Sequence, residues 1–150
     1  MNKRLVALLT IVAGGVACAP VVAHADFSAC ASAFEAKDPQ QQIALYTSCL
    51  KHGGLASTDV AGAFNNRGAL YAGLGDADHA LQDYTSAIQY YPGWALPYAN
   101  RARVEAPRGL CAQAQGDISK ALKLEPHNKQ MLEEKARIEA SCPIISKPTN

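Results

Sequence analysis

The sequence predicts an all-α fold in which about three helical hairpins stack side by side and a final helix closes the array. Three observations lead to this prediction. A pattern of apolar and small residues recurs without a gap, so that segment 61–94 matches segment 95–128. Its members are spaced three or four apart, as on one face of a helix. Glycine or proline stands wherever a helix is expected to end.

The N-terminal segment 1–25 has the layout of a cleavable export signal. Lys3 and Arg4 supply positive charge, an apolar run covers residues 5–17, and the small-x-small triplet Ala23-His24-Ala25 follows. The run is shorter than the ~20 residues of a membrane-spanning helix, so we expect no membrane span. We expect cleavage after Ala25 and a location in the periplasm or outside the cell. A lipid anchor at Cys18 is the alternative.

Composition sets limits on the function. Cleavage would leave segment 26–150, the size of a single domain. Loss of Lys3 and Arg4 would reduce the 14 basic residues to 12, against 13 acidic ones. This near-neutral balance provides no electrostatic footprint for nucleic acid or for an anionic membrane. The sequence contains no Gly-x-Ser-x-Gly, no His-Glu-x-x-His and no glycine-rich phosphate loop. We therefore expect a protein that is not an enzyme and that has no cofactor and no metal.

The first structural unit, residues 26–60, is a degenerate copy of the repeat. Its segment Tyr46-Thr47-Ser48-Cys49-Leu50 parallels Tyr84-Thr85-Ser86-Ala87-Ile88, but the offset between them is four positions longer than the offset between the two clear repeats. We expect Gly53-Gly54 and Ser57-Thr58-Asp59 to hold the four extra residues in a longer loop.

Two clear repeats follow, at 61–94 and 95–128. The first carries Phe64, Gly68, Tyr71, Gly75, Ala80, Tyr84, Ala87 and Pro92. At the equivalent positions of the second stand Tyr98, Ala102, Glu105, Gly109, Ala114, Ile118, Ala121 and Pro126, and seven of the eight pairs keep their physical type. Gly75 should end one helix and Asp76 or Asp78 should cap the next. Glu105 breaks the pattern, and Pro107 should end its helix early.

Residues 129–142 read as a capping helix. Its apolar residues are Met131, Leu132, Ala136 and Ile138, and its charged residues would form an outer face that closes the last apolar surface of the array. Residues 143–150 read as a flexible tail.

The pattern aromatic-x3-Gly-x2-Tyr-x3-Gly-x4-Ala-x3-Tyr-x2-Ala-x4-Pro, strong over residues 61–94 and weaker over 95–128, resembles the tetratricopeptide repeat. The resemblance implies a right-handed α-solenoid whose concave face holds a peptide or protein. The first helices of the hairpins should line that face. The candidate partner-binding residues are Asn65, Asn66, Ala69, Asn100 and Arg103.

The cysteines support the hairpin register. An even number, four, remains after cleavage, which favours disulfides in an exported chain. Residues equidistant from a turn face each other in an antiparallel hairpin. Cys30 and Cys49 are centred on the turn at Pro39, and Cys111 and Cys142 are centred on Pro126. We therefore predict the pairs Cys30–Cys49 and Cys111–Cys142.

The same symmetry argument pairs Arg67 with Asp83 across Gly75, and Arg101 with Asp117 across Gly109. We interpret both pairs as structural ion pairs that fix the register of the hairpins. Use of either arginine to bind a ligand is the alternative.

Three functions remain to be compared. The first is an exported protein–protein interaction module that binds a peptide or protein on the concave face. The second is a small structural helical protein that self-associates through Tyr90, Tyr91 and Trp94. The third, which fewer features favour, is an enzyme or metal carrier that uses Cys49 and His52.

Overall fold

The computed structural model describes residues 25–52 and 54–142, without the side chains of residues 25–29 and 52. The expected export signal, the Cys18 anchor and the 143–150 tail lie outside the described residues, apart from the end of the signal at Ala25. Every regular element of the described part is helical, which confirms the all-α prediction. The elements are α1 Ala25–Glu35, α2 Pro39–His52, α3 Ser57–Gly73, α4 Ala77–Tyr90, α5 Ala95–Glu105, the 3₁₀ helix η1 Ala106–Arg108, α6 Cys111–Leu124 and α7 Lys129–Ser141.

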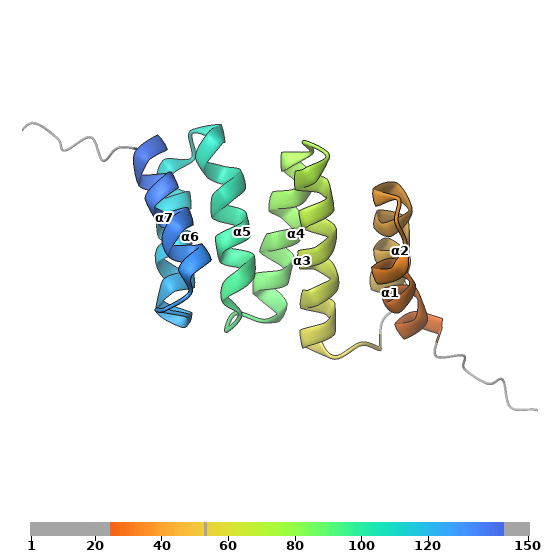
Figure 1. The fold of residues 1–150 in the computed structure, drawn as a ribbon. Helices are drawn as coiled ribbons and strands as arrows, with labels where there is room; N and C mark the ends of the chain where they lie inside the picture. Colours follow the sequence, from red (N-terminus) through yellow and green to blue (C-terminus); the bar gives the residue numbers. More distant parts are fainter. Residues whose placement is uncertain (1–24, 53, 143–150) are drawn as a thin grey trace, which may run out of the picture.

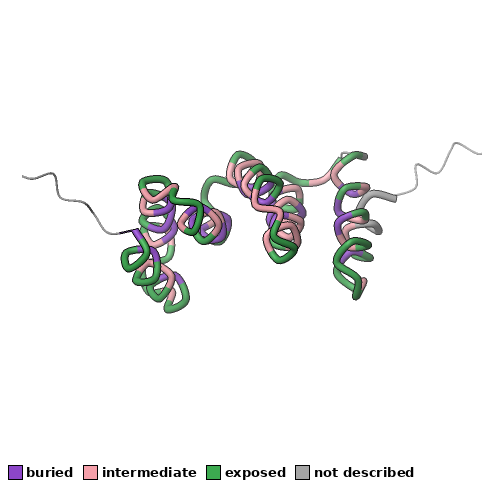
Figure 2. Tube along the Cα trace, turned by 90° about the horizontal axis from the view of Figure 1, so that it is seen from above, coloured by how far each residue is buried: buried purple, intermediate pink, exposed green. Residues whose placement is uncertain are grey.

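The helices form an α-solenoid of three hairpins closed by a single helix. The pairs α1/α2, α3/α4 and α5/α6 follow one another along the array, and α7 packs at its end (Figure 1). Seen from above, the array is bowed, with both ends turned toward the same side (Figure 2). None of the described helices has the length and apolar character that crossing a bilayer requires.

The second hairpin shows why the repeat motif takes the form it does. Gly75 has a φ of 82°, in the left-handed region that ends a helix at low steric cost for glycine. Asp76 then caps α4 by accepting a hydrogen bond from the backbone N–H of His79 at 3.2 Å. Gly68 lies where α3 meets α4, and a Cβ there would stand 3.0 Å from Cε1 of the fully buried Tyr84. The glycine therefore allows the close approach of the two helices.

The third hairpin repeats this plan with one irregularity. Pro107 lies in η1, so α5 ends at Glu105, as the position of the proline predicts. Gly109, with a φ of 75°, then turns the chain into α6. Glu105 occupies the place that Tyr71 has in the second hairpin, and it is buried.

The first hairpin corrects one prediction. Ser57, Thr58 and Asp59 do not belong to a loop, because they form the first turn of α3. The extra residues between the first two repeats therefore lengthen α3 to 17 residues, while α5 has 11. Gly54, with a φ of 84°, belongs to the short link before α3.

The core divides along the array. One buried cluster joins α5, α6 and α7, and the other joins α1, α2 and α3. In α7, Met131 and Ile138 are buried against the last hairpin, whereas Leu132 is 46% exposed and Ala136 is also exposed. The capping helix thus closes the array with two apolar side chains, and its outer face is largely charged.

Candidate binding groove on the inner face

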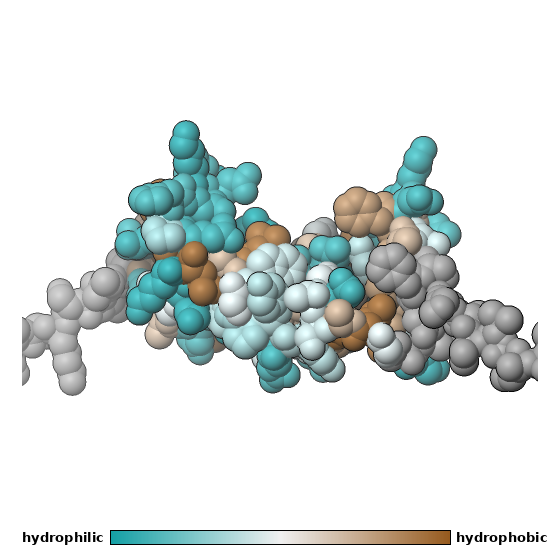
Figure 3. All heavy atoms as spheres, turned by 90° about the horizontal axis from the view of Figure 1, so that it is seen from below, coloured by the Kyte–Doolittle hydropathy of each residue, from teal (hydrophilic) through white to brown (hydrophobic). Residues whose placement is uncertain are grey.

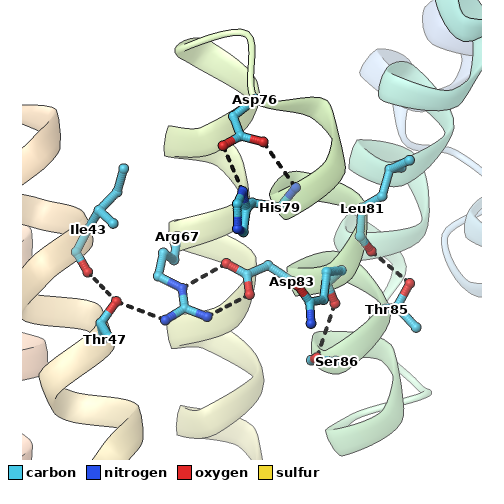
Figure 4. Close-up of polar contacts among 10 residues, drawn as sticks. Ile43, Thr47, Arg67, Asp76, His79, Leu81, Asp83, Thr85 and Ser86 are labelled. Atoms are coloured by element: carbon cyan, nitrogen blue, oxygen red, sulfur yellow. Dashed lines mark hydrogen bonds and ion pairs between the residues drawn. The ribbon is translucent and has the colours of Figure 1, made fainter.

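A hydrogen-bonded set of one threonine, one arginine and one aspartate, which we call a rung, joins the second hairpin to the first and the third to the second. Arg67 on α3 donates from Nε and Nη2 to both carboxylate oxygens of Asp83 on α4, at 2.8 and 2.7 Å. Its Nη1 donates to Oγ1 of Thr47 on α2 at 2.9 Å, as Figure 4 shows. The bidentate hydrogen bonds from Arg67 to Asp83 raise the pKa of the guanidinium further.

The next hairpin builds the same rung. Arg101 binds Asp117 at 2.6 and 2.9 Å and Oγ1 of Thr85 at 3.0 Å. The arginine–aspartate pairs are those that the sequence symmetry predicts, but that symmetry does not identify the two threonines. A signal for them exists, because Thr47 and Thr85 hold the same place in the two parallel segments that mark the first and second repeats. Both arginines are therefore held by hydrogen bonds to neighbouring helices, which favours their interpretation as structural ion pairs.

Glu105 adds a second acidic group to the second rung. Its Oε1 lies 3.8 Å from Nε of Arg101, while its Oε2 is buried without a hydrogen-bond partner among the described residues. Burial, together with the nearby charge of Asp117, raises the pKa of Glu105 to about 7, although Arg101 opposes the shift. This carboxyl group can therefore change charge near neutral pH.

The inner face, formed by α1, α3, α5 and α7, carries a chain of hydrogen bonds that we call the amide relay. Arg103 donates to Asn100 at 2.8 Å, and Asn100 donates to Asn65 at 3.0 Å. Asn65 then donates to Asn66 at 3.3 Å, and Asn66 donates to the hydroxyl of Tyr46 at 3.2 Å. Each amide uses its oxygen as acceptor and its nitrogen as donor, so the chain runs in one direction from α5 across α3 to α2.

The relay corrects the expected exposure of two candidate residues. Asn65 and Asn100 are buried, with 3% and 7% of their surface exposed, because each fills the contact between α3 and α5. Asn66 is half-buried, whereas Ala69 and Arg103 are exposed on the inner face as expected. A ligand on this face would therefore touch Asn66, Ala69 and Arg103 first.

A hollow of about 340 Å³ opens beside Arg103, between α5 and α7. Its lining residues include Leu96, Met131 and Arg137, together with the two glutamates Glu133 and Glu134. Arg137 lies 3.3 Å from Glu134, and Arg103 forms no ion pair with a described carboxylate. The hollow therefore carries charges of both signs, and Arg103 is its arginine without an ion pair among the described residues.

A second opening, which we call the α1–α3 slot, lies at the other end of the relay. It consists of two hollows of about 190 and 310 Å³, and Phe34, Tyr46 and Asn66 line both. Phe34 is 80% exposed. In Figure 3 the two ends of the array rise on either side of a saddle, and the end formed by α7 is predominantly hydrophilic. Sequence reasoning missed the slot, because the degenerate first repeat has no motif that places α1.

Both predicted disulfides are present, Cys30–Cys49 and Cys111–Cys142, with Cα atoms 5.3 and 5.4 Å apart. The thiol of Cys49 is therefore engaged in a bond, and the side chain of His52 lies outside the described residues. Over 25–52 and 54–142, no three His, Cys, Asp or Glu side chains gather in a way that could hold a metal ion.

The aromatic residues proposed for self-association are partly used within the chain. Tyr90 and Tyr91 are 49% and 43% exposed. The ring of Tyr90 nevertheless stacks on Phe64, with centroids 5.7 Å apart. This contact gives Tyr90 a role in the packing of α3 on α4.

Comparisons with known proteins agree with this architecture. No family model matches the sequence. The chain is 34% identical over 71 residues to human tetratricopeptide repeat protein 6, and 29% identical over 98 residues to heat shock protein STI1 of Saccharomyces cerevisiae. These matches cover 47% and 65% of the chain, but only 14% and 16% of those two proteins.

Solved structures match over most of the fold. The second TPR domain of human RPAP3, in complex with the HSP70 peptide SGPTIEEVD, has a TM-score of 0.65 and 25% identity, covering 76% of this chain and 92% of that domain. The TPR2B domain of yeast Sti1, in a complex with pHsp70, has a TM-score of 0.65 and 17% identity, covering 77% and 94%. In fold and in repeat sequence, the chain is similar to tetratricopeptide-repeat domains.

Proposed function

We propose that this protein is an exported interaction module that holds a peptide segment of a partner protein on its inner face. The observation that best supports this proposal is the amide relay. It ends at Arg103 beside an open hollow and at Tyr46 beside the α1–α3 slot. Backbone amides of an extended peptide need hydrogen-bond partners, and Asn66 and Arg103 offer them from one surface. The two solved domains above were determined with HSP70 ligands, which supports peptide binding by this fold.

Export is a separate part of the proposal. The signal-like segment 1–25 supports it, and so do two disulfides in a chain of this size, because such bonds persist in oxidising compartments. Intact mass of the purified native protein tests it. We expect a chain that begins at Asp26 and lacks free thiols. A chain that begins at Cys18 and carries acyl groups would show the lipid-anchored alternative instead.

Site-specific photocrosslinking in living cells tests the inner face. A photoreactive residue at Ala69 should yield discrete crosslinked bands, because Ala69 is exposed beside the relay. The same residue at Lys120, exposed on α6, is the matched control and should yield none. Arg103→Glu should remove the Ala69 bands and Lys120→Glu should leave them. Equal bands from both positions, or bands that survive Arg103→Glu, would contradict binding on this face.

A further inference from the structure

The helix α7 continues the repeat as the first half of a fourth unit. One repeat length separates Arg101 and Ala102 of α5 from Lys135 and Ala136 of α7, as it separates the equivalent residues of α3 from those of α5. In each of the two clear repeats, the second helix of the hairpin covers this face of the first. No described helix follows α7, which stands at the end of the array (Figure 1). The face of α7 that would meet a second helix is therefore open.

Equivalent positions on α5 and α7 differ in exposure. Ala102 of α5 is fully buried, whereas Ala136 at the same place on α7 is exposed. The side chain of Arg101 is 21% exposed and that of Lys135 is 45% exposed. Leu132, at the place of a buried tyrosine of α5, is 46% exposed. A helix docked on α7 would cover these side chains as α6 covers their equivalents on α5.

Two members of a third rung are already present where α6 meets α7. In both complete rungs the threonine hydroxyl donates to the carbonyl four residues earlier, at 2.7 Å, and its oxygen accepts from the arginine. Ser119 of α6 stands one repeat after Thr85 and donates to the carbonyl of Gln115, also at 2.7 Å. Ser119 and Lys135 line one hollow of about 200 Å³ between α6 and α7. Among the described residues, this rung therefore has its hydroxyl and its cation and lacks its aspartate.

The acid beside Lys135 does not take the place of that aspartate. Glu139 lies 3.7 Å from Lys135, one turn along α7, with 56% of its side chain exposed. Arg101 has the equivalent neighbour in Glu105, at 3.8 Å, and still binds Asp117 through two shorter hydrogen bonds. The ammonium of Lys135 has three donors, so a carboxylate from a second helix could accept one of them beside Glu139.

The helices that cover α3 and α5 define the chemistry of the missing helix. Both carry a small residue, an aspartate, a large apolar residue and a second small residue in the pattern Ala-x2-Asp-[Tyr or Ile]-x2-Ala, which is Ala80, Asp83, Tyr84 and Ala87 in α4 and Ala114, Asp117, Ile118 and Ala121 in α6. The aspartate binds the arginine of the first helix, and the large apolar residue is buried. Both aspartates are held inside their own hairpins, so the described part of a second copy offers neither. Residues 143–150 contain no acidic residue.

We propose that the open face of α7 is a docking site for one amphipathic α-helix of a different protein, which presents an aspartate to Lys135 and a large apolar residue beside Ala136. The docked helix completes the fourth hairpin and extends the solenoid by one unit. The hollow at Lys135 shares no lining residue with the hollow at Arg103. This site is therefore separate from the inner face, and both can be occupied at the same time.

A fluorescein-labelled peptide with the sequence of α4 is a suitable probe, because α4 carries the pattern and no cysteine. A hydrocarbon staple between the positions of Asp78 and Gln82, both exposed in α4, keeps the peptide helical. Fluorescence anisotropy with the disulfide-intact protein should show saturable binding. Ala136→Leu should weaken it about tenfold or more, because the larger side chain fills the place where the two helices approach. Ala69→Leu, the same change at an exposed position of the inner face, is the matched control and should leave the affinity unchanged.

Substitutions of Lys135 test the charge pair. Lys135→Gln should weaken binding about threefold to tenfold, and this loss should vanish with a probe that has asparagine at the position of Asp83. Lys135→Arg should strengthen binding of the original probe about threefold, because a guanidinium restores the bidentate pair of the complete rungs. Arg103→Gln, on the inner face, should leave the affinity for both probes unchanged.

Three results would overturn this docking site. One is the absence of probe binding at about 1 mM protein. Another is binding that neither Ala136→Leu nor Lys135→Gln alters, which would mean that the probe exchanges with α4 in its own hairpin. The third is a dimer, seen by light scattering, that dissociates on Ala136→Leu and so assigns this face to a second copy. The crosslinks at Ala69 test the inner face independently of all three.

Discussion

At the scale of single residues, Gly68 shows how a repeat motif is fixed by contact distances. An ideal Cβ on Gly68 would lie 3.0 and 3.1 Å from the ring of Tyr84 and 3.2 Å from Cβ of Asp83. Tyr84 is fully buried and Asp83 belongs to the first rung, so neither can move aside easily. Another helical glycine of α3, Gly62, has open space around the same position.

Substitution by alanine should therefore change the free energy of unfolding in opposite directions at the two glycines. Gly68→Ala should lower the free energy of unfolding by about 1–3 kcal/mol through overpacking. Gly62→Ala should raise it by roughly 0.5–1 kcal/mol, because alanine is the better helix former. Urea denaturation of both variants at one pH checks this. Equal effects of the two substitutions would mean that the α3–α4 contact is looser than the structure shows.

Glu105 makes stability depend on pH. Its pKa in the folded protein is about 7, above the ordinary value of 4.5, so the folded state favours the protonated carboxyl. The stabilisation is therefore complete below the unfolded pKa and is lost as the pH rises through about 7. Between pH 5 and pH 8 the free energy of unfolding should fall by about 2 kcal/mol from this group.

Glu105→Gln isolates that contribution, because glutamine keeps the size of the side chain and cannot titrate. The difference in unfolding free energy between the protein and the variant should change across pH 5 to 8, whereas other titrating groups cancel in the comparison. Glu139→Gln, at an exposed glutamate of α7, is the matched control. A constant difference across this range would show that Glu105 has an ordinary pKa.

At the scale of helices, α1 is attached to the array chiefly through α2. It packs on α2, and among its described side chains only Ala33 is buried. The Cys30–Cys49 disulfide therefore supplies a large part of what holds α1 in place. At the other end, Cys111–Cys142 joins the start of α6 to the residue after α7, where Met131 and Ile138 add buried contacts.

Removal of each disulfide should therefore have a local effect. With Cys30 and Cys49 both changed to alanine, amide exchange in α1 should accelerate about 30-fold or more, which corresponds to the about 2–4 kcal/mol typical of a disulfide. The helices α5, α6 and α7 should keep their protection. Changing Cys111 and Cys142 to alanine is the matched control and should affect α6 and α7 instead. Hydrogen exchange by mass spectrometry distinguishes these patterns, and uniform loss along the chain would contradict them.

Sequence reasoning succeeded for contacts within one hairpin and failed for contacts between successive hairpins. The turn glycines, the arginine–aspartate pairs and the disulfide partners could be predicted, because hairpin symmetry relates each residue to its partner across one turn. The burial of Asn65 and Asn100 could not, because it depends on how closely α3 and α5 approach. The α1–α3 slot was missed for a related reason, since helices from successive hairpins meet there and no motif sets their distance.

At the scale of the whole molecule, the division of the core raises the question of cooperativity. Each hairpin contacts chiefly its neighbours, so stability in such an array is approximately a sum of units and interfaces. The two Thr–Arg–Asp rungs cross both interfaces between hairpins, and the amide relay runs from α2 to α5. These polar links should couple the three hairpins into one unfolding unit.

The capping helix allows a test of this coupling at a distance. Ile138→Ala should lower the free energy of unfolding by about 2–5 kcal/mol, because Ile138 is fully buried against the last hairpin. Leu132→Ala, on the exposed side of α7, should change it by about 0.5 kcal/mol or less. Trp94, the only tryptophan, lies between the second and third hairpins and reports on the middle of the array.

If the hairpins unfold as one unit, fluorescence of Trp94 and far-ultraviolet circular dichroism should give coincident urea transitions, with the disulfides intact. Ile138→Ala should then shift both transitions by the same amount, although Trp94 is outside α7. A shift seen by circular dichroism alone would mean that α7 and its hairpin unfold separately. The rungs and the relay would then fix the register of the hairpins without making their unfolding cooperative.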